Sequence, residues 1–155
     1  MTVRAIPSVA VADERAQIRW ILEECKTTAV VGLSSNPFKD SYIVAHHLHR
    51  QGYDLVPINP NADTILGRPV FPSLSALPTA DAVRVQLVLI FRPGDEVPQI
   101  VDTALAHLPN LKAIWMQKGI VNEHAAARAR DAGLIVVSDR CIRTQHLFAK
   151  FGEPA

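Results

Sequence analysis

Five short apolar runs recur along the chain, and the segments between them place their apolar residues at helical spacing. The runs are residues 28–32, 55–58, 85–91, 113–116 and 134–137. Each run is aliphatic or β-branched almost throughout and does not alternate with polar residues. This pattern is typical of parallel strands that are covered on both faces. The runs therefore predict five strands of one parallel sheet.

The intervening segments carry helix signals. Apolar residues between 97 and 108 fall on one helix face, and the segment 122–132 starts with a capping residue and stops before Gly133. A further helix is expected from about Asp13. Strands that alternate with helices of this length predict a Rossmann-like α/β fold, with a doubly wound five-stranded parallel sheet and helices on both faces.

The connection after the second run differs from the others. Residues 60–78 contain Gly67 and the prolines at 60, 69, 72 and 78, which exclude a long regular helix. We expect an irregular crossover with one short helical turn near residues 73–77. A chain of 155 residues suits one domain over residues 1–155, with a core of about 13–150.

Composition narrows the class of protein. Lys and Arg number 16 against 15 Asp and Glu, and the absence of a basic stripe argues against nucleic acid as a partner. No apolar run approaches the ~18 residues of a membrane span, and the first residues lack the apolar core of a signal peptide. Two cysteines, Cys25 and Cys141, are too few for a disulfide scaffold. We therefore expect a cytoplasmic protein that does not contact a membrane.

The ends of the predicted strands are polar, whereas the strands themselves are not. These ends are residues 32–35, 59–60, 91–93, 117–119 and 138–141. Ligands of open parallel sheets bind beyond the carboxyl ends of the strands, near the point where the strand order reverses. The sequence thus predicts a binding site at this edge, with Gln117 and Gly119 among its residues.

The first of these ends has the features of a phosphate site. Gly32 permits a tight turn, and a helix then begins whose free N–H groups and dipole favour an anion. Lys39 can add a positive charge, and hydroxyl hydrogen bonds can come from Ser34, Ser35 and Ser41. The alternative is an ordinary strand–helix loop that Asp40 or Ser41 caps.

The spacing argues against the two commonest kinds of phosphate-binding nucleotide site. No second glycine precedes Lys39 directly, so the loop is not a Walker A motif, and it does not read G-x-G-x-x-G. The second strand ends in Asn59 and Pro60 rather than in the carboxylate that grips the ribose of NAD. A phosphate-bearing nucleotide without such a gripped ribose fits better.

Several segments together resemble a known family. They are Gly32 to Tyr42, Gly52-Tyr53-x-x-x-Pro57-Ile58-Asn59-Pro60, Phe91-Arg92-Pro93, Trp115-Met116-Gln117-x-Gly119-Ile120 and Asp139-Arg140-Cys141. In this order they resemble the small stand-alone CoA-binding proteins of bacteria and archaea, which are related to the CoA-binding domain of the succinyl-CoA synthetase α subunit. The resemblance covers about residues 20–148.

The resemblance implies a protein that binds coenzyme A or an acyl-CoA without a reaction of its own, as a carrier, sensor or regulatory module. The residues implied at the phosphates are Gly32, Ser34, Ser35 and Lys39. Asn59 and Pro60 would lie beside the ribose and adenine. The opposite wall would consist of Phe91, Arg92 and Pro93, with Val97 near the adenine or pantetheine and Gln117 along the pantetheine channel. This chain has Asn61 and Asp40 where the family often has a basic residue and a proline.

Two alternatives remain from other classes. One is an NAD(P)-dependent oxidoreductase. The other is a thiol-redox protein that uses Cys141, because a helix start and Arg140 both lower a thiol pKa. His46 and His49 are expected to face solvent and make a weak metal site. We expect no catalytic constellation and no metal.

Overall fold

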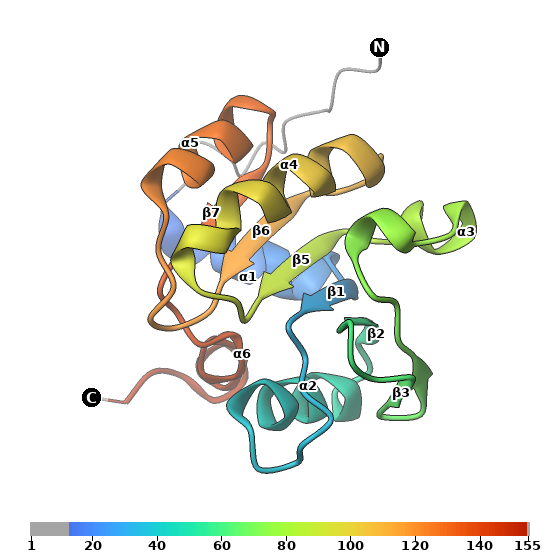
Figure 1. The fold of residues 1–155 in the computed structure, drawn as a ribbon. Coiled ribbons are helices and arrows are strands. Elements are labelled where there is room, and N and C mark those ends of the chain that lie inside the picture. The colour runs from blue at the N-terminus through green and yellow to red at the C-terminus, as the bar shows by residue number, and fades with distance from the viewer. Residues whose placement is uncertain (1–12, 155) are drawn as a thin grey trace.

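The computed structural model describes residues 13–154 and contains one five-stranded parallel sheet (Figure 1). Its strands are Thr27–Val31 (β1), Asp54–Ile58 (β2), Leu87–Ile90 (β5), Ala113–Met116 (β6) and Ile135–Val137 (β7). Their order is β2-β1-β5-β6-β7. The chain therefore steps outward from β1 to β2 and then returns past β1 to β5. The order reverses between β1 and β5, where the ends of neighbouring strands leave a crevice.

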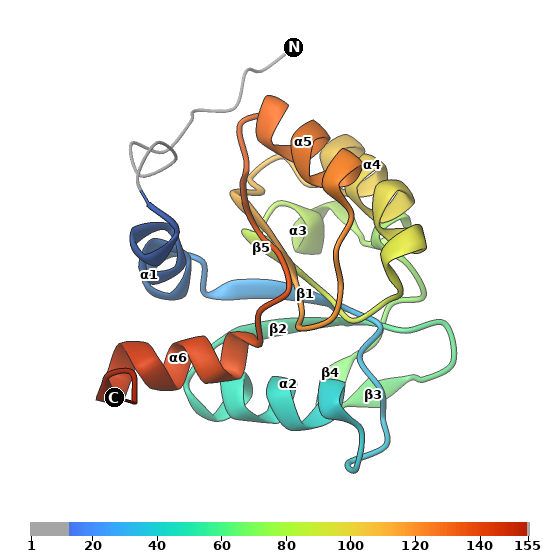
Figure 2. The same cartoon turned by 90° about the vertical axis from the view of Figure 1, so that its left-hand side faces the viewer.

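Helices cover both faces of the sheet (Figure 2). One face carries α1 (Glu14–Glu24), α2 (Asp40–Arg50) and α6 (Ile142–Phe151). The other face carries α4 (Val97–His107) and α5 (Glu123–Asp131), together with α3 (Thr79–Ala82) and the 3-10 turn η2 (Leu74–Ala76). The predicted doubly wound α/β fold is confirmed.

The sheet lies between two apolar clusters, which explains why its strands are apolar throughout. In β6, Ala113 and Trp115 pack toward α1, α2 and α6, whereas Ile114 and Met116 pack toward α4 and α5. All four residues are fully buried. The indole Nε1 of Trp115 donates to the carbonyl of Arg140 at 2.7 Å, so its polar atom is satisfied.

The proline-rich crossover is mostly irregular, and the turn expected near residues 73–77 is η2. The sequence did not predict the small antiparallel hairpin of β3 (Thr64–Ile65) and β4 (Arg68–Pro69). Leu66, with a φ of 53°, precedes Gly67 in its turn. A leucine is rare in the left-handed region, so the usual Asn-Gly turn signal is missing here. Beyond the hairpin, Phe71 forms a parallel bridge with Ile58 and covers the outer edge of β2.

The helix boundaries follow their capping residues. Asp13 accepts from the Ala16 N–H at the start of α1, and Asn122 accepts from the Ala125 N–H at the start of α5. The run predicted over 85–91 is a shorter strand, β5, with Val85 buried just before it. No helix within the described part of the chain is long and apolar enough to cross a membrane. The absence of a signal sequence was inferred mainly from residues 1–12, which lie outside the described residues.

Candidate functional site

A cleft of about 580 Å³ lies at the carboxyl ends of β1, β2 and β5, where the strand order reverses. Its floor contains the last residues of two strands, Val31 and Ile58. One wall is the segment 72–75 of the crossover, and the other is the face of α4 with Gln99, Ile100 and Thr103. The cleft therefore lies where parallel sheets bind their ligands.

The structure brings five of the predicted site residues to this cleft: Gly32, Ser34, Asn59, Pro60 and Arg92. The other eight do not line it: Ser35, Lys39, Ser41, Phe91, Pro93, Val97, Gln117 and Gly119. Val97 is fully buried in the core at the start of α4 and supports the wall from behind. Ser35, Lys39 and Pro93 are exposed, and Phe91 packs partly buried on the sheet face that carries α2.

Gly32 is required at the end of β1. Its φ is +86°, and its N–H donates to the carbonyl of Ile58 at 3.0 Å. A Cβ at this position would lie 2.9 Å from Cδ of Arg92 and 3.2 Å from the carbonyl oxygen of Phe91. The absence of a side chain thus lets Arg92 lie across the end of β1.

The loop between β1 and α2 is held by its own side chains. The Ser34 N–H donates to Oγ of Ser41 at 2.9 Å, and Oγ of Ser34 accepts from the Asn36 N–H at 3.0 Å. Helix α2 then begins at Asp40, and Lys39 at its N-cap provides no side-chain hydrogen bond. The first N–H groups of a helix lack partners within the helix. Lys39 therefore leaves the first N–H groups of α2 without a side-chain cap. A phosphate site at this helix start requires such free N–H groups.

Asn59 ties the first two strand ends together. Its Nδ2 donates to the carbonyl of Leu33 at 2.8 Å, and its Oδ1 accepts from the Asn61 N–H at 2.7 Å. Both polar atoms of the amide are thus used within the protein. Asn59 fixes the mouth of the cleft between the loops that follow β1 and β2.

Arg92 and Glu96 form an ion pair inside the cleft. Nη2 and Nε of Arg92 donate to the two carboxylate oxygens of Glu96 at 2.8 and 3.3 Å. Both side chains are about half exposed, at 48% and 45%. These are the only charged residues among those that line the cleft within the described chain.

The sequence analysis missed the residues that α4 and the crossover contribute. They are Pro72, Ser73, Leu74 and Ser75 from the crossover, and Glu96, Gln99, Ile100 and Thr103 from α4 and the turn before it. The α4 set has a signal in the sequence, because positions 96, 99, 100 and 103 lie on one helix face that starts just after the end of β5. The crossover set has none, because its path is irregular.

The end of β6 contacts α6 rather than the cleft. Oε1 of Gln117 accepts from the Ile142 N–H at 3.1 Å and so caps α6, and Gln117 is only 7% exposed. The Gly119 N–H donates to Oδ1 of Asp139 at 2.6 Å. The two residues therefore join the β6 and β7 loops.

Cys141 lies at the N-cap of α6 and is half buried. Burial raises its thiol pKa, but hydrogen bonds from Thr144, Gln117 and the Arg143 backbone outweigh burial, so the net pKa lies below the ordinary value. Cys25 is fully buried, and burial raises its pKa to about 12. Only Cys141 thus has an environment that favours a thiolate.

Two of the histidines, His47 on α2 and His146 on α6, contact each other. Nε2 of His47 lies 3.0 Å from Nδ1 of His146, and the pKa of each is lowered, first by burial and then by neighbouring cations or the other histidine. His46 is exposed as expected, whereas His49 is only partly exposed and its Nδ1 is buried without a hydrogen-bond partner. Within residues 13–154, no three His, Cys, Asp or Glu side chains are placed to hold a metal ion.

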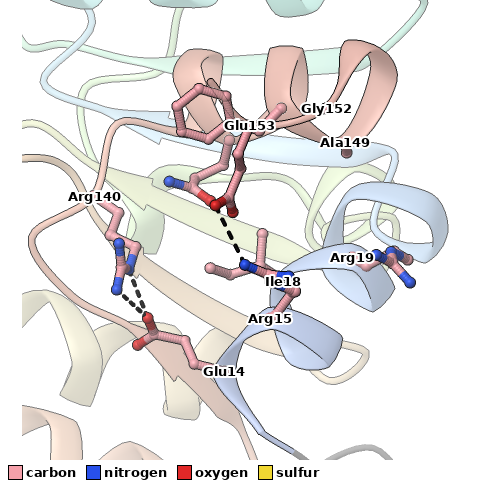
Figure 3. Close-up of a pocket in the computed structure, with 10 residues that line it drawn as sticks. Glu14, Arg15, Ile18, Arg19, Arg140, Ala149, Gly152 and Glu153 are labelled. Atoms are coloured by element: carbon pink, nitrogen blue, oxygen red, sulfur yellow. Dashed lines mark hydrogen bonds and ion pairs between the residues drawn. The ribbon is translucent and has the colours of Figure 1, made fainter. Parts of the chain in front are cut away.

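A second hollow, of about 570 Å³, lies between α1 and α6 (Figure 3). Ion pairs cross it: Nε of Arg140 lies 2.6 Å from Glu14, and Nη2 of Arg15 lies 3.2 Å from Glu153. Arg140 thus pairs with α1, although it follows the end of β7. None of the predicted site residues lines this hollow.

The comparisons with known proteins identify the family. Residues 26–146 match the family described as CoA binding domain, so the chain belongs to this family of CoA-binding domains. It is similar to the uncharacterized protein YneT of Bacillus subtilis (strain 168), with 32% identity over 136 residues, which cover 88% of this chain and 96% of YneT.

Solved structures agree with this assignment. A hypothetical protein from Pyrococcus horikoshii OT3 is 31% identical, covers 94% of this chain and 96% of its own length, and superposes with a TM-score of 0.78. The dinucleotide-forming acetyl-coenzyme A synthetase 1 of Ca. Korarchaeum cryptofilum, in complex with phosphate and ADP, is 25% identical with a TM-score of 0.63. That match covers 76% of this chain but only 26% of the synthetase, so it concerns one domain of a larger enzyme.

Proposed function

We propose that this protein binds coenzyme A or an acyl-CoA in the cleft between the ends of β1, β2 and β5. It acts by binding, as a non-catalytic carrier, sensor or regulatory module of the cytoplasm. The observation that carries the proposal is the position of the cleft: it lies at the point of strand reversal, within the residues that match the family.

The chemistry of the cleft suits the nucleoside part of coenzyme A. Apolar side chains of Ile58, Leu74 and Ile100 can pack against a flat adenine ring. The hydroxyl group of Ser73 and the side-chain amide of Gln99 can form hydrogen bonds with the ribose and the ring nitrogens. Such a mixture of apolar walls and a few polar groups is typical of small-molecule sites.

We assign the phosphates to the loop between β1 and α2, which begins at the cleft with Gly32. Gly32 lets a ligand approach the backbone closely, and the start of α2 offers N–H groups that Lys39 does not cap. The ammonium group of Lys39 and the guanidinium group of Arg92 then supply the positive charge, with the hydroxyl groups of Ser34 and Ser35 nearby. By the family resemblance, the pantetheine arm would extend toward the end of β6, whose Gln117 and Gly119 do not line the cleft itself.

The 3′-phosphate of coenzyme A lacks a dedicated basic partner. Asn61, which lines the cleft, is uncharged, and the cleft holds no cation besides Arg92 among the described residues. We therefore expect 3′-dephospho-CoA to bind about as tightly as coenzyme A.

The test is a calorimetric titration of the full chain with coenzyme A, with 3′-dephospho-CoA and NAD⁺ in parallel. Micromolar binding of coenzyme A that weakens in the Lys39→Ala variant supports the proposal. The matched control is Lys150→Ala, because Lys150 is exposed like Lys39 but lies near the C-terminal end of α6, away from the carboxyl ends of the strands. Binding of NAD⁺ without coenzyme A contradicts the proposal and favours the oxidoreductase.

One observation favours a second function, thiol exchange at Cys141. Its lowered pKa increases the thiolate fraction. This thiolate would attack a disulfide of coenzyme A, form a mixed disulfide with one half and release the other half as a thiolate. Mass spectrometry after incubation with CoA disulfide tests the reaction. A Cys141→Ser variant that loses the adduct but still binds coenzyme A separates the two functions.

A further inference from the structure

The cleft is electrically balanced, although the proposed ligand is a polyanion. Among residues 13–154, its lining holds one cation, Arg92, and one anion, Glu96, and the remaining lining residues are uncharged. A site that served only to attract phosphates would not need a carboxylate. The presence of Glu96 beside the only lining cation therefore calls for a role.

The geometry joins the two side chains closely. Glu96 accepts from both Nη2 and Nε of Arg92, at 2.8 and 3.3 Å, which is the bidentate arrangement that guanidinium groups form with carboxylates and phosphates alike. The carboxylate thus occupies the edge of the guanidinium group that a phosphate would bind. A phosphate on this edge must replace Glu96.

The backbone around the pair is held in place. A Cβ at Gly94 would lie 2.6 Å from the carbonyl oxygen of Val121, so the turn that carries Glu96 fits closely against the loop after β6. Nδ2 of Asn122 donates to the carbonyl of Gly94 at 3.0 Å. Arg92 in turn lies over Gly32 at the end of β1. Because both ends are anchored, side-chain rotation rather than backbone movement must separate the pair.

We propose that Glu96 sets the affinity of the cleft for phosphate-bearing nucleotides: its carboxylate holds Arg92 in the free protein and is exchanged for a phosphate when the ligand binds. This inference rests on the proposed binding of coenzyme A. Glu96 is a positioning residue that acts through Arg92, and it weakens the binding of polyanions. Such a device keeps the ligand exchangeable, which suits a carrier or sensor.

The experiment is a double-mutant cycle, measured by calorimetric titration of the full chain with coenzyme A. Glu96→Gln should bind about three- to tenfold more tightly than the wild type, or about 1 kcal/mol in total, because the guanidinium group of Arg92 no longer has to be released from an exposed ion pair. In the Arg92→Met background, the same substitution should change the affinity by less than about twofold, since no guanidinium group remains to be exchanged. Glu96→Asp keeps the charge and should stay closer to the wild type.

A control variant and the salt dependence of binding separate this role of Glu96 from a purely structural one. Asp95→Asn makes the same charge change on an exposed neighbour that does not line the cleft, and it should leave the affinity unchanged. The affinity of Glu96→Gln should fall more steeply with salt than that of the wild type, because the attraction of Arg92 for the ligand is no longer offset.

The outcomes are distinct. If the wild type binds coenzyme A and Glu96→Gln binds equally or less tightly, the inference is wrong and the proposed function stands. An equal gain in the Arg92→Met background also overturns the exchange, because Glu96 would then repel the ligand directly. If neither the wild type nor Glu96→Gln binds coenzyme A, the proposed function itself fails.

Discussion

Two hollows of nearly equal volume, about 580 and 570 Å³, are built from different parts of this fold. The cleft lies at strand ends, where backbone turns such as Gly32 fix its shape. The hollow between α1 and α6 is lined mainly by side chains of these two helices, and four of its five charged residues form two ion pairs, Arg15 with Glu153 and Arg140 with Glu14. Volume therefore does not distinguish the proposed binding cleft from the hollow between the helices, whereas the surrounding backbone does.

The cleft and the hollow differ in the interactions that fix their walls. Loops at the cleft are tied by buried or half-buried hydrogen bonds, as between Asn59 and Leu33. The hollow is crossed by exposed ion pairs, with Arg15 72% exposed. Exposed pairs contribute little to stability, so they do not hold a fixed ligand geometry. The predictions below are designed to separate the two regions.

The largest effect is expected from Gly32→Ala. The new Cβ would displace Arg92 and crowd the end of β1, and the binding of coenzyme A should weaken by about thirtyfold, or roughly 2 kcal/mol. Gly52→Ala is the matched control, because Gly52 has a φ of +91° but no atom within 4 Å of its Cβ position. Both variants should lose about 1–2 kcal/mol of unfolding free energy through left-handed strain. Equal loss of ligand binding in both variants, measured by calorimetry, would contradict the account.

The second-largest effect is expected from substituting one arginine in each region. Arg92→Met should weaken the binding of coenzyme A by about tenfold, because a charge-assisted hydrogen bond to a phosphate is lost. Arg140→Met removes an arginine from the hollow and should leave the affinity unchanged. Calorimetric titrations of both variants test this contrast, and a reversed order would move the site to the hollow.

Acidic pH should loosen the helix layer that contains the hollow. His47 on α2 and His146 on α6 have pKa values below the ordinary 6.5, and Lys26, Arg143 and Lys150 add positive charge around the pair. The folded protein therefore binds fewer protons than the unfolded chain, and stability is fully present above pH 6.5 and declines as the pH falls below it.

Thermal unfolding at pH 7.5 and pH 5 measures this decline. It should be smaller in His47→Gln, because only one member of the pair can then become charged. His124→Gln changes an exposed histidine on α5 and should behave like the wild type. The same decline in all three proteins would show that the histidine pair is not its source.

The smallest effect is expected from Arg15→Ala. The ion pair with Glu153 is exposed on both sides, at 72% and 51%, and its loss should cost less than about 1 kcal/mol of unfolding free energy. Urea unfolding measures this cost. A larger loss would show that the hollow is a structured site rather than a gap between helices.

Local signals predicted most of the fold. The apolar runs predicted all five strands of the parallel sheet, and the capping residues Asp13 and Asn122 predicted the starts of α1 and α5. These features depend on neighbouring residues and on burial on both faces. The hairpin escaped prediction because Leu66 takes a conformation that a leucine rarely adopts.

The site was less predictable. Gly32 and Arg92 lie in the cleft because strand ends converge at one edge, a rule that can be applied to a sequence. The opposite wall, at residues 72–75, depends on the path of an irregular crossover. The pair of Arg140 with Glu14 joins residues 126 positions apart, and no local pattern indicates such a contact.

The most direct test is a titration of the isotope-labelled protein with coenzyme A, followed by the amide chemical shifts. The account predicts that the largest changes occur at Gly32, Ser34, Arg92 and Glu96, while the amides of α1 keep their positions. No change on addition of coenzyme A, or changes centred on Arg15 and Arg140, would contradict the assignment of the cleft as the binding site.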